Sequence, residues 1–290
     1  MTQVAARTDV PAGLAVLLDR LSGAQAVDET LSALVSEAAT VSSRPGYETL
    51  LCAGSLGFTP FGYQVQTAQT VLRRMRGRAL LADEVGLGKT IEAGLVLTEL
   101  RTRGLADKVL VVAPAGLVEQ WQEELERKFG LPTAIVSGTG AFAHDRSGPA
   151  PVMIASLAAA RREPLKARLT DRAWDLVIAD EAHRLRNPRS ASGLLARALR
   201  SRFLLLLTAT PVENKLQDLY ELVSLIAPGL LGTPAEFRKR HGFDDPAAPK
   251  DVAGLRARTR EVMIRHRRSE VAVRLPQRLA ETVLVEPSAE

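Results

Sequence analysis

The residues best suited to chemistry form a glycine-rich run in the first third of the chain. The run reads Asp-Glu-Val-Gly-Leu-Gly-Lys-Thr over residues 83–90, and it lies between a strand-like apolar stretch and a helix-like one. Its glycines let the backbone turn so that successive N–H groups point at phosphate oxygens, and a helix N-terminus adds partial positive charge. The run therefore predicts a nucleotide phosphate site of the phosphate-loop type.

One position of this run departs from the general pattern Gly-x-x-x-x-Gly-Lys-Ser/Thr. Asp83 stands where the first glycine is expected. The other positions fit, with Lys89 able to reach the β- and γ-phosphates and the Thr90 hydroxyl able to bind Mg²⁺. The candidate residues for binding ATP are Asp83, Glu84, Val85, Gly86, Leu87, Gly88, Lys89 and Thr90.

Two adjacent carboxylates end a second apolar run, farther along the chain. Residues 176–179 are apolar, and Asp180 and Glu181 follow directly. At the carboxyl end of a buried strand, both side chains can turn toward the edge where α/β sheets bind ligands. We predict that Asp180 holds Mg²⁺, directly or through water, and that Glu181 orients and polarises the attacking water. With Lys89, these carboxylates form the predicted catalytic set.

The elements that must position these motifs alternate regularly from residue 58 onward. Short apolar runs predict buried strands, and amphipathic stretches of helical length lie between several of them. This alternation is typical of a parallel sheet that is covered by helices on both faces. The predicted strands are residues 79–82, 109–113, 133–136, 152–156, 176–180 and 203–208, and the predicted helices are residues 89–103, 117–129, 191–199 and 216–226.

The two ends of the chain differ from this central part. Residues 1–57 look helical and carry no candidate chemistry, so we expect a helical extension or linker there. The alternation stops after residue 232, and residues 233–290 are expected to form an arginine-rich helical protrusion with a closing strand at 279–285. The predicted fold class is α/β, with a doubly wound, mostly parallel sheet over residues 58–232.

Composition limits the surroundings and the partners of the protein. The longest apolar runs are too short to cross a membrane, and the single cysteine excludes an intramolecular disulfide framework. Both observations predict a cytoplasmic protein with no membrane partner. Of 38 basic and 33 acidic residues, the first 57 positions hold three and six, which leaves 35 and 27 for the remainder. A basic body is compatible with a polyanionic partner.

A basic stretch follows the paired carboxylates. Residues 183–202 contain six arginines and no acidic residue. Backbone phosphates of nucleic acid are natural partners for such a stretch, because these contacts need only charge and reach; a solvated helix face is the alternative. Aromatic residues make up only 4% of the chain, which favours duplex tracking over the stacking of single-stranded bases. Trp121, on an amphipathic helix, is expected in the core rather than against a base.

Several ordered motifs resemble the SWI/SNF-related branch of superfamily-two helicases. These are the loop with aspartate for its first glycine, Asp-Glu-Ala-His at 180–183, Arg-Leu-Arg-Asn at 184–187 and Leu-Thr-Ala-Thr-Pro-Val-Glu-Asn at 207–214. Residues 263–268 and 275–278 are similar to the segment that closes the first lobe of that family. The resemblance covers residues 58 to about 285.

The resemblance implies a RecA-like lobe of a double-stranded-DNA translocase. Gln64 is similar to the upstream glutamine that reads adenine in the family, and His183 to a residue that contacts the opposite lobe or a neighbouring motif. Thr208 and Thr210 could sense the γ-phosphate and couple hydrolysis to movement, although a pair of strand-capping threonines would look the same. The candidate nucleic-acid contacts are Pro114, Gln120, Ser156, Arg184, Arg186 and Asn187.

Motors of this family have a second RecA-like lobe, which supplies an arginine finger. These 290 residues show no second series of alternating strands and helices, so we expect the second lobe in cis or in trans. We also expect residues 265–268 to lie on the protrusion, away from the nucleotide. A nucleotide-dependent binding module for DNA or a partner protein, without catalysis, is the alternative function. An unrelated phosphate-loop kinase is disfavoured, because the threonine motif replaces the expected acceptor pocket and lid.

Overall fold

The computed structural model describes residues 46–138, 150–211, 215–242 and 250–271. From Thr49 onward these residues belong to one compact unit. Most of the expected extension over residues 1–57, and the strand expected at 279–285, lie outside the described residues. Within the described ranges, no helix combines the length and the apolar character that crossing a bilayer requires.

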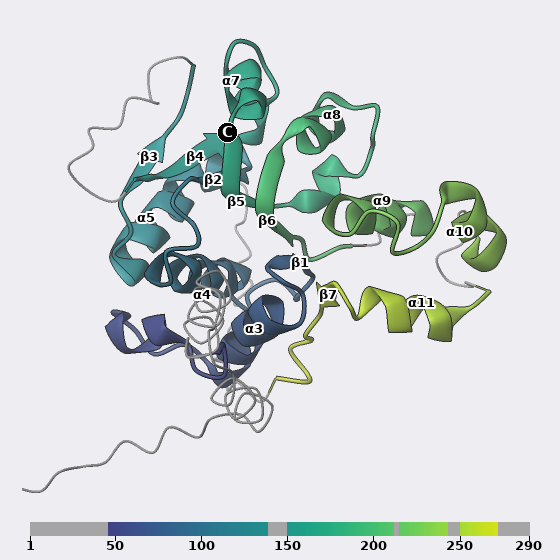
Figure 1. Ribbon diagram of the computed structural model, residues 1–290, viewed down its shortest axis with the longest axis horizontal. Helices are drawn as coiled ribbons and strands as arrows, with labels where there is room; N and C mark the ends of the chain where they lie inside the picture. The colour runs from purple at the N-terminus through teal and green to yellow at the C-terminus, as the bar shows by residue number, and fades with distance from the viewer. Residues whose placement is uncertain (1–45, 139–149, 212–214, 243–249, 272–290) are drawn as a thin grey trace, which may run out of the picture. The chain divides into compact units, whose positions relative to one another are not determined.

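Seven parallel strands form a single sheet in the described part of the chain, in the order β3-β4-β2-β5-β6-β1-β7 (Figure 1). β2 and β4 are buried along almost their whole length, and β5 and β6 are buried mainly in their C-terminal halves, as expected when helices cover both faces. This confirms the predicted parallel α/β sheet. The strands are β1 (Arg78–Leu81), β2 (Val109–Ala113), β3 (Thr133–Ile135), β4 (Val152–Ser156), β5 (Ala173–Ala179), β6 (Arg200–Leu207) and β7 (Met263–Ile264).

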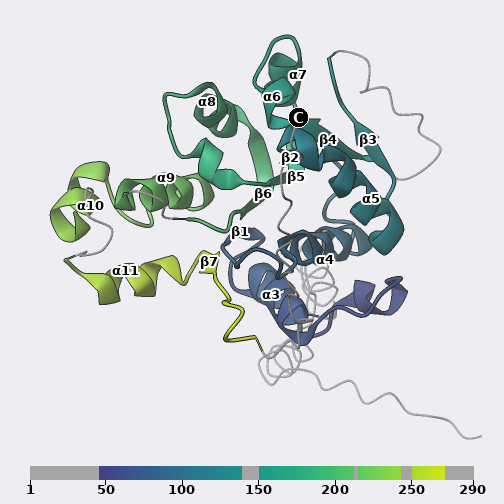
Figure 2. The ribbon, with the colours of Figure 1, turned by 180° about the vertical axis from the view of Figure 1, so that it is seen from behind.

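Helices lie on both faces of this sheet. Figures 1 and 2 show α3, α4 and α5 on one face, and α6, α7, α8 and α9 on the other. The helix α4 is buried on all sides between Ile91 and Leu100, whereas α5 buries only one stripe of side chains. The helices are α3 (Gly62–Arg73), α4 (Lys89–Thr102), α5 (Val118–Phe129), α6 (Leu157–Ala160), α7 (Leu165–Asp171), α8 (Ala191–Ala198), α9 (Leu216–Ile226), α10 (Pro234–His241) and α11 (Val252–Thr259).

Three short 3₁₀ helices complete the described elements: η1 (Leu51–Ser55), η2 (Ala115–Leu117) and η3 (Ala182–Leu185). The first of them packs on α4, where the Cys52 amide donates to the buried carboxylate of Glu99 at 2.9 Å. Glu99 also accepts from Arg103 at 2.7 Å. Through Glu99, η1 is attached to the end of α4.

The C-terminal part is helical at first, as predicted, but then returns to the sheet. After α10 and α11, the two-residue strand β7 pairs in parallel with β1, with Leu80 opposite Met263. The amides of Leu80 and Ala82 donate to Val262 at 2.7 Å and to Ile264 at 2.8 Å. Residues 265–268 consequently run beside the phosphate loop. The expectation that they lie away from the nucleotide loop is wrong, because β1 offers an open edge whose amides need acceptors.

Candidate functional site

The phosphate loop connects β1 to α4, as the sequence predicted. Gly86 and Gly88 have φ values of +85° and +81°, in the left-handed region that favours glycine. Gly88 is the N-cap of α4 and provides no side-chain cap, so the first amides of the helix are left for a ligand. Leu87 is 2% exposed and anchors the loop, whereas the Val85 side chain is 69% exposed at its tip. This backbone geometry fits a phosphate group.

Lys89 is folded back across its own loop. Its Nζ donates to the carbonyl of Asp83 at 2.7 Å and to that of Glu84 at 3.4 Å. An anion bound at the loop would compete with these two carbonyls for the ammonium group. Thr90, in the first turn of α4, is only partly buried, which leaves its hydroxyl accessible for a metal ion.

Gln64 lies against the phosphate loop. It is 4% exposed, and its Nε2 donates to the Leu87 carbonyl at 3.1 Å. The Tyr63 hydroxyl donates to the same carbonyl. Gln64 Nε2 would also lie 2.6 Å from a Cβ at Gly88, so the glycine permits this approach. The role of Gln64 as a reader of adenine stays a prediction.

A hollow of about 400 Å³ opens on the outer side of α3. Phe61 and Tyr63 stack there at 5.9 Å between ring centroids, and Phe61 is 52% exposed. Burial, with smaller contributions from Glu92 and Asp83, raises the pKa of Tyr63 above its usual value. Aromatic faces beside a phosphate loop suit a purine base. No motif or periodicity in the sequence predicted this hollow.

Asp180 is held by hydrogen bonds to both carboxylate oxygens. The Trp121 indole Nε1 donates to Oδ2 at 2.9 Å, and the Glu181 amide donates to Oδ1 at 2.8 Å. Trp121 is 1% exposed, which confirms its expected place in the core. Its hydrogen bond to Asp180 was not foreseen, because 59 residues separate the two positions.

Glu181, His183 and Thr208 form one connected group. Glu181 has a φ of +49°, an uncommon conformation for a residue with a side chain. His183 Nδ1 lies 3.1 Å from Glu181 Oε2 and 3.4 Å from Thr208 Oγ1. Thr208 is fully buried, and its Oγ1 accepts from the Thr210 amide at 3.2 Å. The ends of β5 and β6 are therefore linked through one imidazole.

Sheet order brings these groups to one edge. β6 lies between β1 and β5, with Leu81 opposite Leu207 and Ala179 opposite Leu206. Since neighbouring strands are about 4.8 Å apart, the end of β5 lies about 10 Å from the end of β1. That spacing leaves room for a phosphate and a metal ion between the loop and Asp180.

Three of the residues predicted to contact nucleic acid lie near the edge of the sheet that holds the phosphate loop, after β2 and β4. Pro114 directly follows β2, and Ser156 ends β4 opposite Ala113. The Ser156 hydroxyl caps α6, accepting from the Ala159 amide at 3.1 Å. Gln120 is exposed on α5.

The arginines of the basic stretch differ in their partners. Arg184 and Asn187 are exposed, whereas Arg186 Nε lies 3.5 Å from Asp218 of α9. Another arginine of the stretch, at position 197, pairs with Glu221 of α9 at 2.6 Å. The basic stretch is thus partly neutralised by acidic side chains that the local sequence does not contain.

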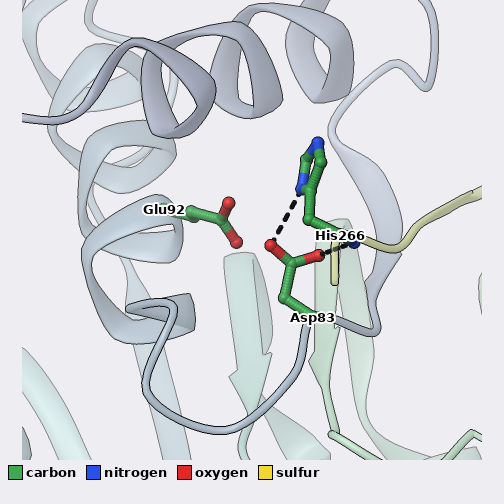
Figure 3. Close-up of side chains that lie close together, drawn as sticks. All are labelled: Asp83, Glu92 and His266. Atoms are coloured by element: carbon green, nitrogen blue, oxygen red, sulfur yellow. Dashed lines mark hydrogen bonds and ion pairs between the residues drawn. The ribbon is translucent and has the colours of Figure 1, made fainter. Parts of the chain in front are cut away.

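The segment after β7 contacts the phosphate loop directly. The Arg268 guanidinium donates to the Val85 carbonyl at 2.6 and 3.1 Å, and its backbone amide donates to Glu84 Oε2 at 3.1 Å. The His266 amide and its Nδ1 contact the two oxygens of Asp83 at 2.8 and 2.9 Å (Figure 3). This hydrogen bond with Asp83 raises the pKa of His266 above its usual value.

A parallel sheet with helices on both faces, and a phosphate loop opposite paired carboxylates, define a RecA-like nucleotide-binding lobe. Residues 63–290 match the sequence profile of the SNF2-related domain, and the chain belongs to this family. The SWI2/SNF2 ATPase core of Sulfolobus solfataricus, solved in complex with double-stranded DNA, superposes with a TM-score of 0.60 at 26% identity, over 73% of this chain and 45% of that one.

Curated bacterial proteins are similar in sequence. YqhH of Bacillus subtilis, an uncharacterized ATP-dependent helicase, is 39% identical over 234 residues, which cover 79% of this chain and 40% of that protein. RapA, an RNA polymerase-associated protein of Stutzerimonas stutzeri, is 36% identical over 208 residues, which cover 67% and 22%. The chain thus spans less than half the length of these relatives. It is a RecA-like lobe of the SNF2-related family.

Proposed function

We propose that this chain is the ATP-binding lobe of a double-stranded-DNA translocase, and that it hydrolyses ATP only when a second RecA-like lobe completes the site. The observation that carries the proposal is the position of the phosphate loop and of Asp180 at one edge of the sheet, with only β6 between their strands. This is the half-site that phosphoryl transfer to water requires.

The roles of the residues follow from this geometry. Lys89 would leave the carbonyls of Asp83 and Glu84 and bind phosphate oxygens instead. Thr90 and Asp180 would hold Mg²⁺, which neutralises phosphate charge when it is bound. Because hydrogen bonds already fix both oxygens of Asp180, this ligand is oriented before the metal ion arrives.

Glu181 would orient the attacking water, and His183 would transmit the state of the site. The imidazole lies within 3.4 Å of both Glu181 and Thr208. A change in the position of Glu181 would therefore shift His183 and its contact with Thr208 at the end of β6. This supports the coupling role proposed for His183, Thr208 and the neighbouring Thr210.

Double-stranded DNA is the partner that we propose for the exposed residues near this edge. The Sulfolobus core was solved in complex with double-stranded DNA, and phosphate contacts need exposed cations. Arg184 is exposed, whereas Arg186 has an acidic neighbour at 3.5 Å. We therefore assign Arg184 the larger share of the phosphate contacts.

The isolated chain should hydrolyse ATP barely above background. An arginine finger accelerates comparable reactions by about 10³–10⁵, which corresponds to roughly 4–7 kcal/mol of barrier. Arg268, in the described part of the closing segment, contacts the loop, but its side chain is engaged by the Val85 carbonyl. We expect the finger to come from the second lobe instead.

Steady-state ATP hydrolysis tests this proposal. The 290-residue chain should show background turnover with and without duplex DNA. Addition of a second lobe, in cis or in trans, should restore DNA-stimulated turnover, and Glu181→Gln should abolish it. Turnover by the chain alone at about one per second, lost in both Glu181→Gln and Arg268→Ala, would contradict the proposal. Nucleotide binding without turnover, even with a second lobe, would favour a binding module.

Nucleotide binding is tested separately by calorimetry with Mg²⁺. With half of the site present, we expect a Kd on the order of tens to hundreds of micromolar, or roughly 5–6 kcal/mol. Lys89→Ala should abolish measurable binding. Lys128→Ala is a matched control, since this lysine pairs with Glu124 at 3.4 Å on α5. Equal binding by the wild type and Lys89→Ala would show that the loop does not bind nucleotide.

A further inference from the structure

Two buried carboxylates and an imidazole meet beside the phosphate loop, and the proposed ATP chemistry uses none of the three side chains (Figure 3). They belong to Asp83 in the loop, Glu92 in α4 and His266 after β7. One ligand atom from each lies within 4.8 Å of the other two. We propose that these three residues bind a divalent transition metal ion such as Zn²⁺, at a site separate from the Mg²⁺ of the nucleotide.

Glu92 gives the strongest reason for a cation at this position. It is fully buried, and neither of its carboxylate oxygens has a hydrogen-bond partner among the described residues. Figure 3 shows its carboxylate facing Asp83, which is also fully buried. Two carboxylates that face each other away from water repel, and an unpaired buried charge is costly. A cation between them would pair with Glu92 and offset its repulsion from Asp83.

The nearest ammonium group does not fill this role. Lys89 Nζ is engaged by the backbone carbonyls of Asp83 and Glu84. The His266 ring hydrogen-bonds Asp83 through Nδ1 at 2.9 Å and packs edge-on against the Tyr63 ring. Its backbone amide also donates to Asp83 at 2.8 Å, so the imidazole is held next to the carboxylates independently of its protonation.

The three donors select the class of metal. One imidazole nitrogen with two carboxylate oxygens suits Zn²⁺ and its first-row neighbours, whereas Mg²⁺ and Ca²⁺ prefer all-oxygen sites. Bond lengths to Zn²⁺ of about 2.0–2.2 Å require ligand atoms closer than about 4.4 Å. Small side-chain rotations of Glu92 and His266 would be enough to close the site. The metal ion would then replace the proton between His266 and Asp83.

Protonation of Glu92 is the alternative to a metal ion at this position. Burial, and after it the charge of Asp83, raise the pKa of Glu92 well above its usual value. A protonated Glu92 would also relieve the repulsion, without any metal ion. The two possibilities differ in one observable, which is stoichiometric binding of a transition metal by the nucleotide-free protein.

Titration of the nucleotide-free chain with Co²⁺, followed by visible absorption and by competition with Zn²⁺, makes this measurement. We expect one Co²⁺ per chain, displaced by Zn²⁺. Glu92→Gln and His266→Ala should each weaken binding by more than about 100-fold, because loss of an outer-sphere partner alone costs about 10–100-fold. Asp180→Asn and His183→Ala should retain the signal, which separates this site from the predicted Mg²⁺ site.

Circular dichroism would establish that each variant is folded. His266 is the safer variant, because its side chain is 29% exposed whereas Glu92 is fully buried. Saturable binding that is lost in His266→Ala supports the proposal even if Glu92→Gln does not fold. Absence of saturable binding by the wild type, or equal binding by folded His266→Ala, overturns it and leaves the proton on Glu92.

Discussion

Replacement of Trp121 by phenylalanine tests how the structure orients the predicted metal ligand Asp180. The phenyl ring keeps an aromatic side chain in the core but removes the indole N–H that Asp180 Oδ2 accepts at 2.9 Å. Oδ1 keeps its bond from the Glu181 amide at 2.8 Å, so the carboxylate loses one of its two restraints. We expect weaker binding of Mg²⁺ in the nucleotide complex and little change in nucleotide contacts at the loop.

The size of the effect can be worked from this single hydrogen bond. A hydrogen bond to a charged group contributes about 1.5–3 kcal/mol. Loss of a partner that orients a metal ligand lowers metal affinity by about 10–100-fold, which corresponds to roughly 1.4–2.7 kcal/mol at 25 °C. The two free-energy ranges agree. Half-saturation by Mg²⁺ should therefore need at least about tenfold more metal in Trp121→Phe.

Trp174→Phe is the matched control. Trp174 is 2% exposed, and its Nε1 donates to the Leu169 carbonyl at 2.9 Å. Both variants lose one indole and one hydrogen bond, so both should unfold at lower denaturant concentration. Only Trp121→Phe should change the Mg²⁺ dependence of nucleotide binding, measured by calorimetry at fixed nucleotide and increasing Mg²⁺. Equal shifts in the two folded variants, or none in either, would refute the orienting role.

Three further expectations concern backbone, charge and pH. Gly88→Ala should reduce nucleotide affinity more than Gly104→Ala. Both glycines have positive φ (+81° and +68°), but only a Cβ at Gly88 would meet a neighbouring side chain. Equal affinities of the two variants by calorimetry would contradict this. Arg184→Glu should weaken binding to every duplex and flatten its salt dependence, so unchanged salt titrations would exclude phosphate contacts. Burial alone would raise the pKa of Glu99, but hydrogen bonds from Cys52, its neighbour and Arg103 lower it. The stabilisation of the folded state by ionised Glu99 is therefore present above its usual pKa near 4.5 and is lost as the pH falls below that pKa. Urea unfolding of Glu99→Gln should consequently differ least from that of the wild type in acid.

The central strands were the easiest elements to predict from sequence. β2 and β4 begin and end at the predicted residues: β2 is uniformly apolar between Lys108 and Pro114, and β4 begins after Pro151 and ends on the polar Ser156. β5 and β6 begin earlier than predicted, at Ala173 and Arg200. Their first residues are polar or exposed there, so backbone pairing continues where the apolar pattern has not yet begun. Hydrophobic periodicity reveals which residues are buried, whereas backbone pairing of exposed residues leaves no pattern in the sequence.

β7 and the contacts of residues 265–268 could not be predicted from the sequence, for a different reason. A two-residue strand has no measurable period. Its placement depends on an open edge at β1, and the His266–Asp83 pair joins positions 183 residues apart. The basic character of His266 and Arg268 is visible in the sequence, but it predicts only a place on the arginine-rich protrusion. Only the fold shows that their partners are in the phosphate loop.

The parallel pairing of β7 with β1 has a mechanical consequence. Backbone hydrogen bonds join the segments in register, among them three from the amides of Leu80, Ala82 and Glu84 to the carbonyls of Val262, Ile264 and His266. Tension on the chain beyond residue 271 would pull β7 along its own axis. The three bonds would then be loaded together in shear rather than unzipped one by one. Because the last of them ends in the phosphate loop, a load carried by the following polypeptide would reach the nucleotide pocket without passing through the rest of the sheet.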